Sequence, residues 1–207
     1  MSRQDPKITS RAGDPLCTFL KHKIPYMPLA SLNYRLSPAV RHPAHVNDIL
    51  AAIEHLKDEY EMKEFVVVGH SVGACLAFQT CHVQGCRGVV GVEGIYDIPG
   101  LIEEYPKYRD FVEAAIGSDE SVWKEASPTT ILDKSGKEFK LDVLLIQSRE
   151  DELLPSRQTD RMLEILRENT NAQVDAVAWI NGQHDACLST TEFHELVYTF
   201  LTQKFKI

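Results

Sequence analysis

A pentapeptide of the pattern Gly-x-Ser-x-Gly, residues 69–73, lies between two different hydrophobic patterns. It follows the apolar run Phe65–Val68, which is typical of a buried strand, and precedes a helical pattern from Ala74 to Gln84. A turn this tight lifts the serine hydroxyl clear of the sheet, and glycine is expected at both flanks because Cβ atoms there would clash. We therefore expect Ser71 to be a nucleophile in acyl transfer. The backbone N–H of Val72 would face the developing oxyanion.

A serine nucleophile needs a base, and the base needs an acid that orients it. The carboxyl ends of parallel strands meet at one edge of a sheet, so the acid should follow a later strand. Asp151 follows the predicted strand 141–146 and is the expected acid. Glu150 and Glu152 are competitors beside it, with solvated loop charges as their ordinary role. Asp97, after an earlier strand, is a further alternative.

The expected base is His184, which follows the predicted strand 174–180 and precedes the last helix. It comes after the serine and the acid in the chain, the order expected for this arrangement. His70 lies inside the pentapeptide, where we expect it to pack beside the serine. The other histidines are interpreted as surface or core residues: His22, His42, His45, His55, His82 and His194.

Apolar runs and helical periodicities alternate along the rest of the chain. Predicted strands lie at 27–32, 65–68, 89–92, 141–146 and 174–180, and predicted helices at 44–59, 74–84, 156–168 and 192–204. This alternation indicates an α/β fold with a mostly parallel sheet, in one domain over residues 1–207. Residues 98–130, interrupted by prolines, predict short helices or irregular structure that cap the site. Residues 1–25 are polar and broken by glycine and proline.

Composition argues against several classes of partner. The net charge of −8 argues against nucleic acid and anionic membrane surfaces, which bind basic patches. No apolar stretch approaches the length of a membrane span, and the polar start Met1–Pro6 has no signal-peptide core. The five cysteines are scattered, and Cys81 and Cys86 lack a second pair for a zinc site. We expect free thiols in the cytoplasm and no bound metal.

Several longer segments give the chain a family resemblance. The pentapeptide alone is typical of the α/β-hydrolase superfamily. In chain order the segments are Asn33–Pro38, Gly69–Ala74, Gly94–Tyr96, Glu104–Tyr108, Asp151–Leu154 with Arg157–Thr159, and the glycine-flanked His184. With these segments the chain resembles the fungal-type kynurenine formamidases, also called arylformamidases.

The resemblance implies hydrolysis of N-formyl-L-kynurenine to formate and L-kynurenine in tryptophan catabolism, without a cofactor. Ser71 would attack the formyl carbon, His184 would take its proton, and Asp151 would hold the imidazole tautomer. Tyr96 and Tyr105 are candidates for contacting the substrate, with ordinary packing as the alternative. The resemblance also suggests a homodimer.

One family motif has no counterpart here. Family members carry His-Gly-Gly-x-Trp after the third strand, followed by Asp-Pro; this sequence has no His-Gly-Gly-x-Trp, and the pair Asp5-Pro6 stands at its start. We therefore expect a fold shortened at its N-terminus, in which the strand between 27–32 and 65–68 is missing. Two alternatives to the formamidase stay open: a short-chain carboxylesterase of the same fold, and an inactive remnant without an oxyanion loop.

Overall fold

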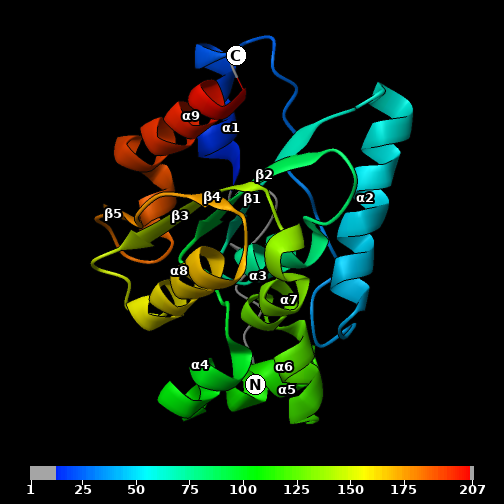
Figure 1. Ribbon diagram of the computed structural model, residues 1–207, viewed down its shortest axis with the longest axis vertical. Helices are drawn as coiled ribbons and strands as arrows, with labels where there is room; N and C mark the ends of the chain where they lie inside the picture. The colour runs from blue at the N-terminus through cyan, green and yellow to red at the C-terminus, as the bar shows by residue number, and fades with distance from the viewer. Residues whose placement is uncertain (1–12, 206–207) are drawn as a thin grey trace.

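A parallel sheet forms the centre of the protein, and the computed structural model describes residues 13–205 around it (Figure 1). Expectations that fall on residues 1–12, Asp5-Pro6 among them, lie outside the described residues. The strands are β1 (Phe65–His70), β2 (Cys86–Val92), β3 (Asp142–Ser148), β4 (Gln173–Val174) and β5 (Ala178–Ile180). β2 lies between β1 and β3, while β4 pairs with the start of β3 and β5 with its end.

The register brings the carboxyl ends of three strands to one edge. His70 of β1 lies beside Val92 of β2, and Val92 lies beside Ile146 of β3. The loops that leave these strands therefore begin next to one another. This edge is where polar side chains from distant parts of the chain can meet.

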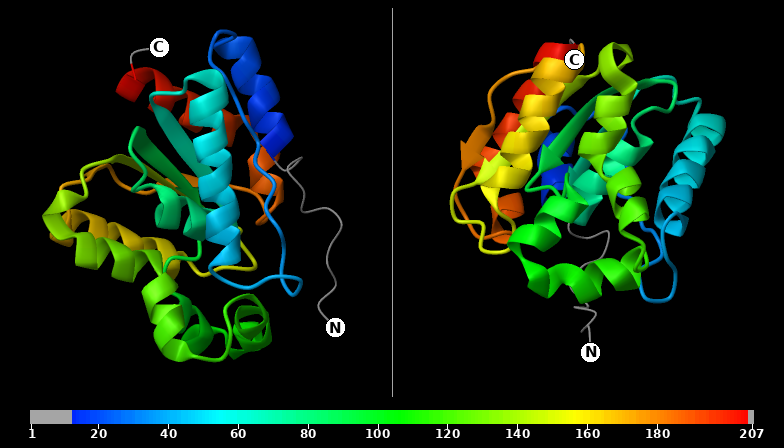
Figure 2. Two further views of the ribbon diagram at one scale, coloured as in Figure 1. Left: turned by 90° about the vertical axis from the view of Figure 1, so that its right-hand side faces the viewer. Right: turned by 60° about the horizontal axis from the view of Figure 1, so that its bottom comes forward.

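Helices cover both faces of the sheet (Figure 2). α1 and α9 pack on one face, and α3, α7 and α8 on the other, where α2 packs alongside α3. The α-helices are α1 (Asp14–Lys23), α2 (Ala44–Tyr60), α3 (Val72–Thr80), α4 (Ile98–Glu104), α5 (Arg109–Ala115), α6 (Glu120–Ala126), α7 (Pro128–Ser135), α8 (Ser156–Asn169) and α9 (Thr191–Phe205). Short 3₁₀ turns are η2 (Pro106–Tyr108), η3 (Gly136–Glu138) and η4 (Ala186–Ser189).

The two-residue period of the strands divides the core between these faces. Val89 and Leu145 belong to the cluster under α3, α7 and α8, whereas Val90 and Ile146 belong to the cluster under α1 and α9. All four side chains are at most 1% exposed. Burying each contributes about 1.5–3 kcal/mol, so the continuous apolar strands need cover on both faces.

Residues 98–130 form the short helices that the sequence predicts. Figure 1 shows α4, α5 and α6 grouped together beyond the end of the sheet. A third apolar cluster holds them, and it includes Leu101, Val112 and Trp123 of these helices together with Cys75 of α3. Their role as a cap remains a prediction.

Three expectations about elements need correction. Residues 27–32 form no strand, and within residues 13–205 β1 is the edge strand of the sheet. Met27 and Leu29 instead pack against the cluster under α1 and α9. The strand expected at 174–180 is split into β4 and β5. The polar N-terminal residues, in which glycine and proline were expected to prevent regular structure, contain α1 (Asp14–Lys23).

The remaining strands and helices lie where the sequence predicts them, within a few residues. All five cysteines are free, and four of them are buried. Across residues 13–205, no helix combines the length and hydrophobicity that a bilayer span requires.

Candidate active site

The turn between β1 and α3 holds Ser71 in an unusual conformation. Its φ of 56° and ψ of −122° place a non-glycine residue in the left-handed half of the Ramachandran map. The backbone is held there by hydrogen bonds from Ser71 N to Val92 O (2.9 Å) and from Ala74 N to Ser71 O (3.1 Å). The hydroxyl itself makes no hydrogen bond with the described residues, and the side chain is half-buried. Ser71 is therefore strained, and no hydrogen bond joins its hydroxyl to His184 among the described residues.

The two flanking glycines are not equivalent. A Cβ at Gly69 would lie 2.2 Å from the carbonyl oxygen of Gly73, so no side chain fits there. A Cβ at Gly73 would meet nothing within 4 Å. The expected clash is thus confirmed at Gly69 and wrong at Gly73. Val72 is the first residue of α3, so its N–H lacks a partner inside the helix.

His184 and Asp151 come together across two loops. His184 Nδ1 lies 3.0 Å from Asp151 Oδ1, and the two side chains are 4% and 1% exposed. The N–H groups of Leu153 and Leu154 also donate to Oδ1, each at 2.9 Å. A carboxylate only accepts hydrogen bonds, so Nδ1 carries the proton and Nε2 of the neutral ring is left as a base.

Glu150 and Glu152 support the histidine loop rather than the imidazole. Glu150 Oε2 accepts the N–H of Gly182 at 3.1 Å, and Glu152 Oε2 accepts the N–H of His184 at 3.0 Å. The hydroxyl of Ser148 donates to the carbonyl of Gly182. Neither glutamate is a free loop charge. Together they hold the backbone of the loop that presents His184.

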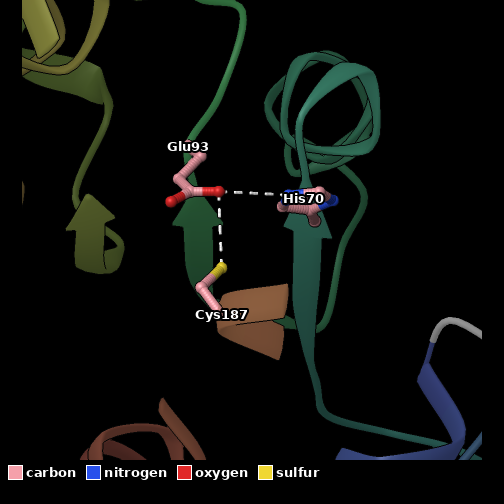
Figure 3. A group of neighbouring side chains, drawn as sticks. All are labelled: His70, Glu93 and Cys187. Carbon is pink, nitrogen blue, oxygen red and sulfur yellow. Dashed lines mark hydrogen bonds and ion pairs between the residues drawn. The ribbon is translucent and has the colours of Figure 1, made fainter. Parts of the chain in front are cut away.

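A second buried carboxylate, Glu93, also reaches His184. Its Oε2 lies 3.3 Å from His184 Nδ1, and the side chain is fully buried. Figure 3 shows the same oxygen, at the end of β2, facing His70 of the neighbouring strand (3.4 Å) and the thiol of Cys187 (3.3 Å). The N–H of Ser148 donates to Oε1 at 3.1 Å. Glu93 thus contacts the ends of β1 and β3 and the segment that carries His184 and Cys187.

His184, Asp151 and Glu93 shift one another's pKa values. Burial disfavours the charged form of each, but their mutual contacts outweigh it. Burial lowers the pKa of His184, and contacts with Asp151 and Glu93 raise it to about 9. Burial raises the pKa values of both carboxyls, whereas His184 and further hydrogen-bond donors hold them below their ordinary range. The two carboxylates therefore favour the imidazolium form of His184, and the neutral ring that can act as a base gains ground as the pH rises toward 9.

The remaining candidates lie elsewhere. Asp97 caps α4 by accepting the N–H of Gly100 and pairs with Arg161 (2.9 Å), so it is not the partner of His184. Tyr96 is fully buried, with its ring edge-on to Phe78 at 5.7 Å between centroids. Tyr105 is half-buried among the short helices of residues 98–130.

The sequence profile of the alpha/beta hydrolase fold family matches residues 9–187. The chain belongs to this family. A solved alpha/beta hydrolase structure agrees in fold: the acetyl ester-xyloside bifunctional hydrolase from Caldicellulosiruptor lactoaceticus. It has a TM-score of 0.69 and 17% identity, covering 91% of this chain and 75% of that chain.

Relatives within the family carry a narrower name. A kynurenine formamidase from Meyerozyma guilliermondii is 40% identical over 153 residues, which are 66% of this chain and 58% of the relative. A kynurenine formamidase-like hydrolase from Fusarium equiseti is 32% identical, covering 76% of this chain and 64% of the relative. The hydrolase chain thus spans about three fifths of the length of these relatives. The resemblance found in the sequence is confirmed.

Glu93 is the site residue that sequence reasoning missed. A signal was available, because Glu93 directly follows the apolar run Val89–Val92 and so begins at the carboxyl edge of the sheet. The alternative acid that the sequence suggests is Asp97, four residues later. At Glu93 the backbone turns to a positive φ of 45°, and the carboxylate lies beside the imidazole of His184.

Three overlapping groups of described side chains at this edge have the types that bind metal ions, with ligand atoms within 4.8 Å of one another in each. They are His70, Glu93 and Cys187; His70, His184 and Asp185; and Glu93, Asp151 and His184. In the first and the last group these atoms already contact each other. The expectation that the hydrolase needs no metal stays a prediction.

Proposed function

We propose that the chain carries the catalytic centre of a serine hydrolase that cleaves N-formyl-L-kynurenine to formate and L-kynurenine. One observation carries the proposal: the strained Ser71 elbow lies at the sheet edge where Asp151 engages His184 Nδ1. That arrangement suits acyl transfer. The substrate follows from the relatives named kynurenine formamidase.

In the first half-reaction, Ser71 Oγ forms a bond to the formyl carbon while His184 Nε2 takes the hydroxyl proton. Asp151 keeps the other ring proton on Nδ1 and stabilises the imidazolium. Collapse of the tetrahedral intermediate breaks the C–N bond, and the proton on Nε2 passes to the leaving arylamine. His70 is the residue directly before Ser71, and its ring centroid lies 4.4 Å from that of His184. This distance supports a position of His184 near Ser71.

In the second half-reaction, His184 takes a proton from water as the water oxygen attacks the formyl-serine ester. Return of that proton to Ser71 Oγ releases formate and restores the enzyme. The mechanism consumes one water and needs no cofactor. The N–H of Val72 is the proposed oxyanion donor, and a single such donor contributes a factor of about 10²–10³ in rate.

The pocket and setting complete the proposal. Tyr105 is a candidate for contact with the aryl part of the substrate, because Tyr96 is enclosed in the core. Residues 98–130 would cover the substrate as a cap. A cytoplasmic homodimer is proposed on family resemblance alone, and the free thiols suit a reducing compartment.

A second candidate is the hydrolysis of short-chain esters by the same residues. It is favoured by a relative named versiconal hemiacetal acetate esterase, from Aspergillus parasiticus, which is 30% identical over 104 residues. An ester has a better leaving group than an arylamide, so it depends less on proton transfer from His184.

The test compares formate release from N-formyl-L-kynurenine with cleavage of p-nitrophenyl acetate, using the 207-residue protein and its Ser71→Ala variant. The formamidase proposal expects a higher kcat/KM for the formamide and loss of both activities in the variant. Preference for the ester would favour the second candidate. A folded wild-type protein without either activity would indicate an inactive chain, and an active Ser71→Ala protein would refute the mechanism.

A further inference from the structure

Glu93 occupies a position that the mechanism above does not use. It follows β2, the strand between the one that leads to Ser71 and the one that leads to Asp151. Its side chain is completely buried, although a buried carboxylate is costly unless polar partners compensate it. A buried carboxylate with specific charged partners in such a place is a candidate for a functional role.

The polar partners of Glu93 hold its carboxylate beside the ring of His184. The N–H of Ser148 fixes Oε1 from the side of β3. Oε2 accepts the thiol proton of Cys187 and faces His70 Nε2, which also faces the carbonyl oxygen of His184 at 3.1 Å. Because both groups facing that nitrogen are acceptors, His70 Nε2 carries a proton. These donors offset the burial of the charge without neutralising it.

The imidazole of His184 therefore faces two carboxylates through one nitrogen. Nδ1 lies 3.0 Å from Asp151 Oδ1 and 3.3 Å from Glu93 Oε2. Asp151 makes the hydrogen bond, while Glu93 lies close enough to add a second, nearly equal electrostatic attraction. An imidazolium in this position is stabilised from two strands at once.

We propose that Glu93 is a second positioning acid of the hydrolase, which works with Asp151 to hold the Nδ1 proton of His184 and to stabilise its imidazolium. Asp151 supplies the direct hydrogen bond, and Glu93 supplies charge and limits rotation of the ring. The inference rests on the proposed function for the role of His184, but its test reads the imidazole directly.

The charged and titratable groups around the ring must all be considered in that test. Glu93 comes from the end of β2, Asp151 from the loop after β3, and His70 from β1. Glu152 binds the backbone N–H of His184, and Asp185 and Cys187 lie on its own segment. Among the carboxylates that contact His184, Asp151 and Glu93 face the ring nitrogen and Glu152 faces the main chain.

The experiment is an NMR pH titration of the histidine rings in ¹⁵N-labelled protein, with His184 assigned from its loss in His184→Asn. Glu93→Gln is expected to lower the pKa of His184 by about one pH unit, the effect of removing one nearby opposite charge. The matched control is Glu152→Gln, which makes the same chemical change beside the main chain, and its expected shift is a small fraction of that. Asp151→Asn with Glu93→Gln should bring the pKa to or below the ordinary histidine value.

Equal pKa values for His184 in Glu93→Gln and wild type would overturn the proposal, as would equal shifts in Glu93→Gln and Glu152→Gln. If Glu93→Gln does not fold, Glu93→Asp serves in its place. It keeps the charge but withdraws it by one methylene, so the pKa should fall below wild type. An unchanged pKa in that variant would equally refute the idea. All these readings stand whether or not the protein hydrolyses a formamide, so failure of the proposed function is seen separately.

Discussion

Replacing Ser71 by glycine is expected to stabilise the folded protein while removing its nucleophile. The φ of 56° at Ser71 lies in a region that non-glycine residues adopt at a cost of about 1–3 kcal/mol, and glycine adopts it freely. Glycine also increases the entropy of the unfolded chain, which lowers stability by about 0.4–1 kcal/mol. The serine hydroxyl makes no hydrogen bond with the described residues, so little else is lost.

The net expectation is a gain of about 1 kcal/mol in the free energy of unfolding, or about 2–4 °C in melting temperature for a domain of this size. Ser71→Ala is the matched control, because it removes the same hydroxyl and keeps the Cβ that causes the strain. Urea unfolding of the three proteins, followed by circular dichroism, measures the difference. At an unstrained position glycine would be the less stable of the two variants. That order here would refute the strain argument.

Three further predictions concern the same edge of the sheet. Gly69→Ala should destabilise the fold by at least about 2 kcal/mol, since its Cβ would lie 2.2 Å from a carbonyl oxygen. Gly73→Ala should instead stabilise α3 by up to about 1 kcal/mol, because a Cβ there meets nothing within 4 Å. Thermal melts of the two variants measure the difference. Asp151→Asn should lower kcat at least about 100-fold, and Asp97→Asn far less; the reverse order in steady-state assays would identify a different acid. The pKa of His184, raised from about 6.5 to about 9, should contribute about 3 kcal/mol of stability that is fully present below pH 6.5 and lost as pH rises through 9. Urea unfolding at pH 6 and pH 9.5 measures this loss, which His184→Asn should largely abolish.

Much of the site could be predicted because its chemistry imposes local sequence patterns. The tight turn at Ser71 requires glycine at position 69, and the order of serine, acid and base along the chain led to Asp151 and His184. Their pairing depends only on where strands end, which the apolar runs indicate well. The roles of Glu150 and Glu152 could not be predicted, because their hydrogen bonds go to the backbone of a loop distant in sequence.

The errors have separate physical causes. α1 was missed because Gly13 and Pro15 look like helix breakers, although proline is tolerated in the first turn of a helix. Residues 27–32 have strand-like apolar content, but a strand forms only where a neighbour accepts its hydrogen bonds. Glu93 was missed because its direction depends on a positive φ at the strand end, which no local pattern encodes.

The hydrogen bonds of Glu150 and Glu152 have a consequence for how this site can change over time. Asp151 lies between two residues that clamp the histidine loop, and Ser148 clamps it again from the strand. An insertion or deletion in the loop that carries Asp151 or in the loop that carries His184 would disturb all three of these hydrogen bonds together. The two loops should therefore accept length changes only in concert, whereas residues 98–130 take no part in these three hydrogen bonds and should tolerate such changes more readily.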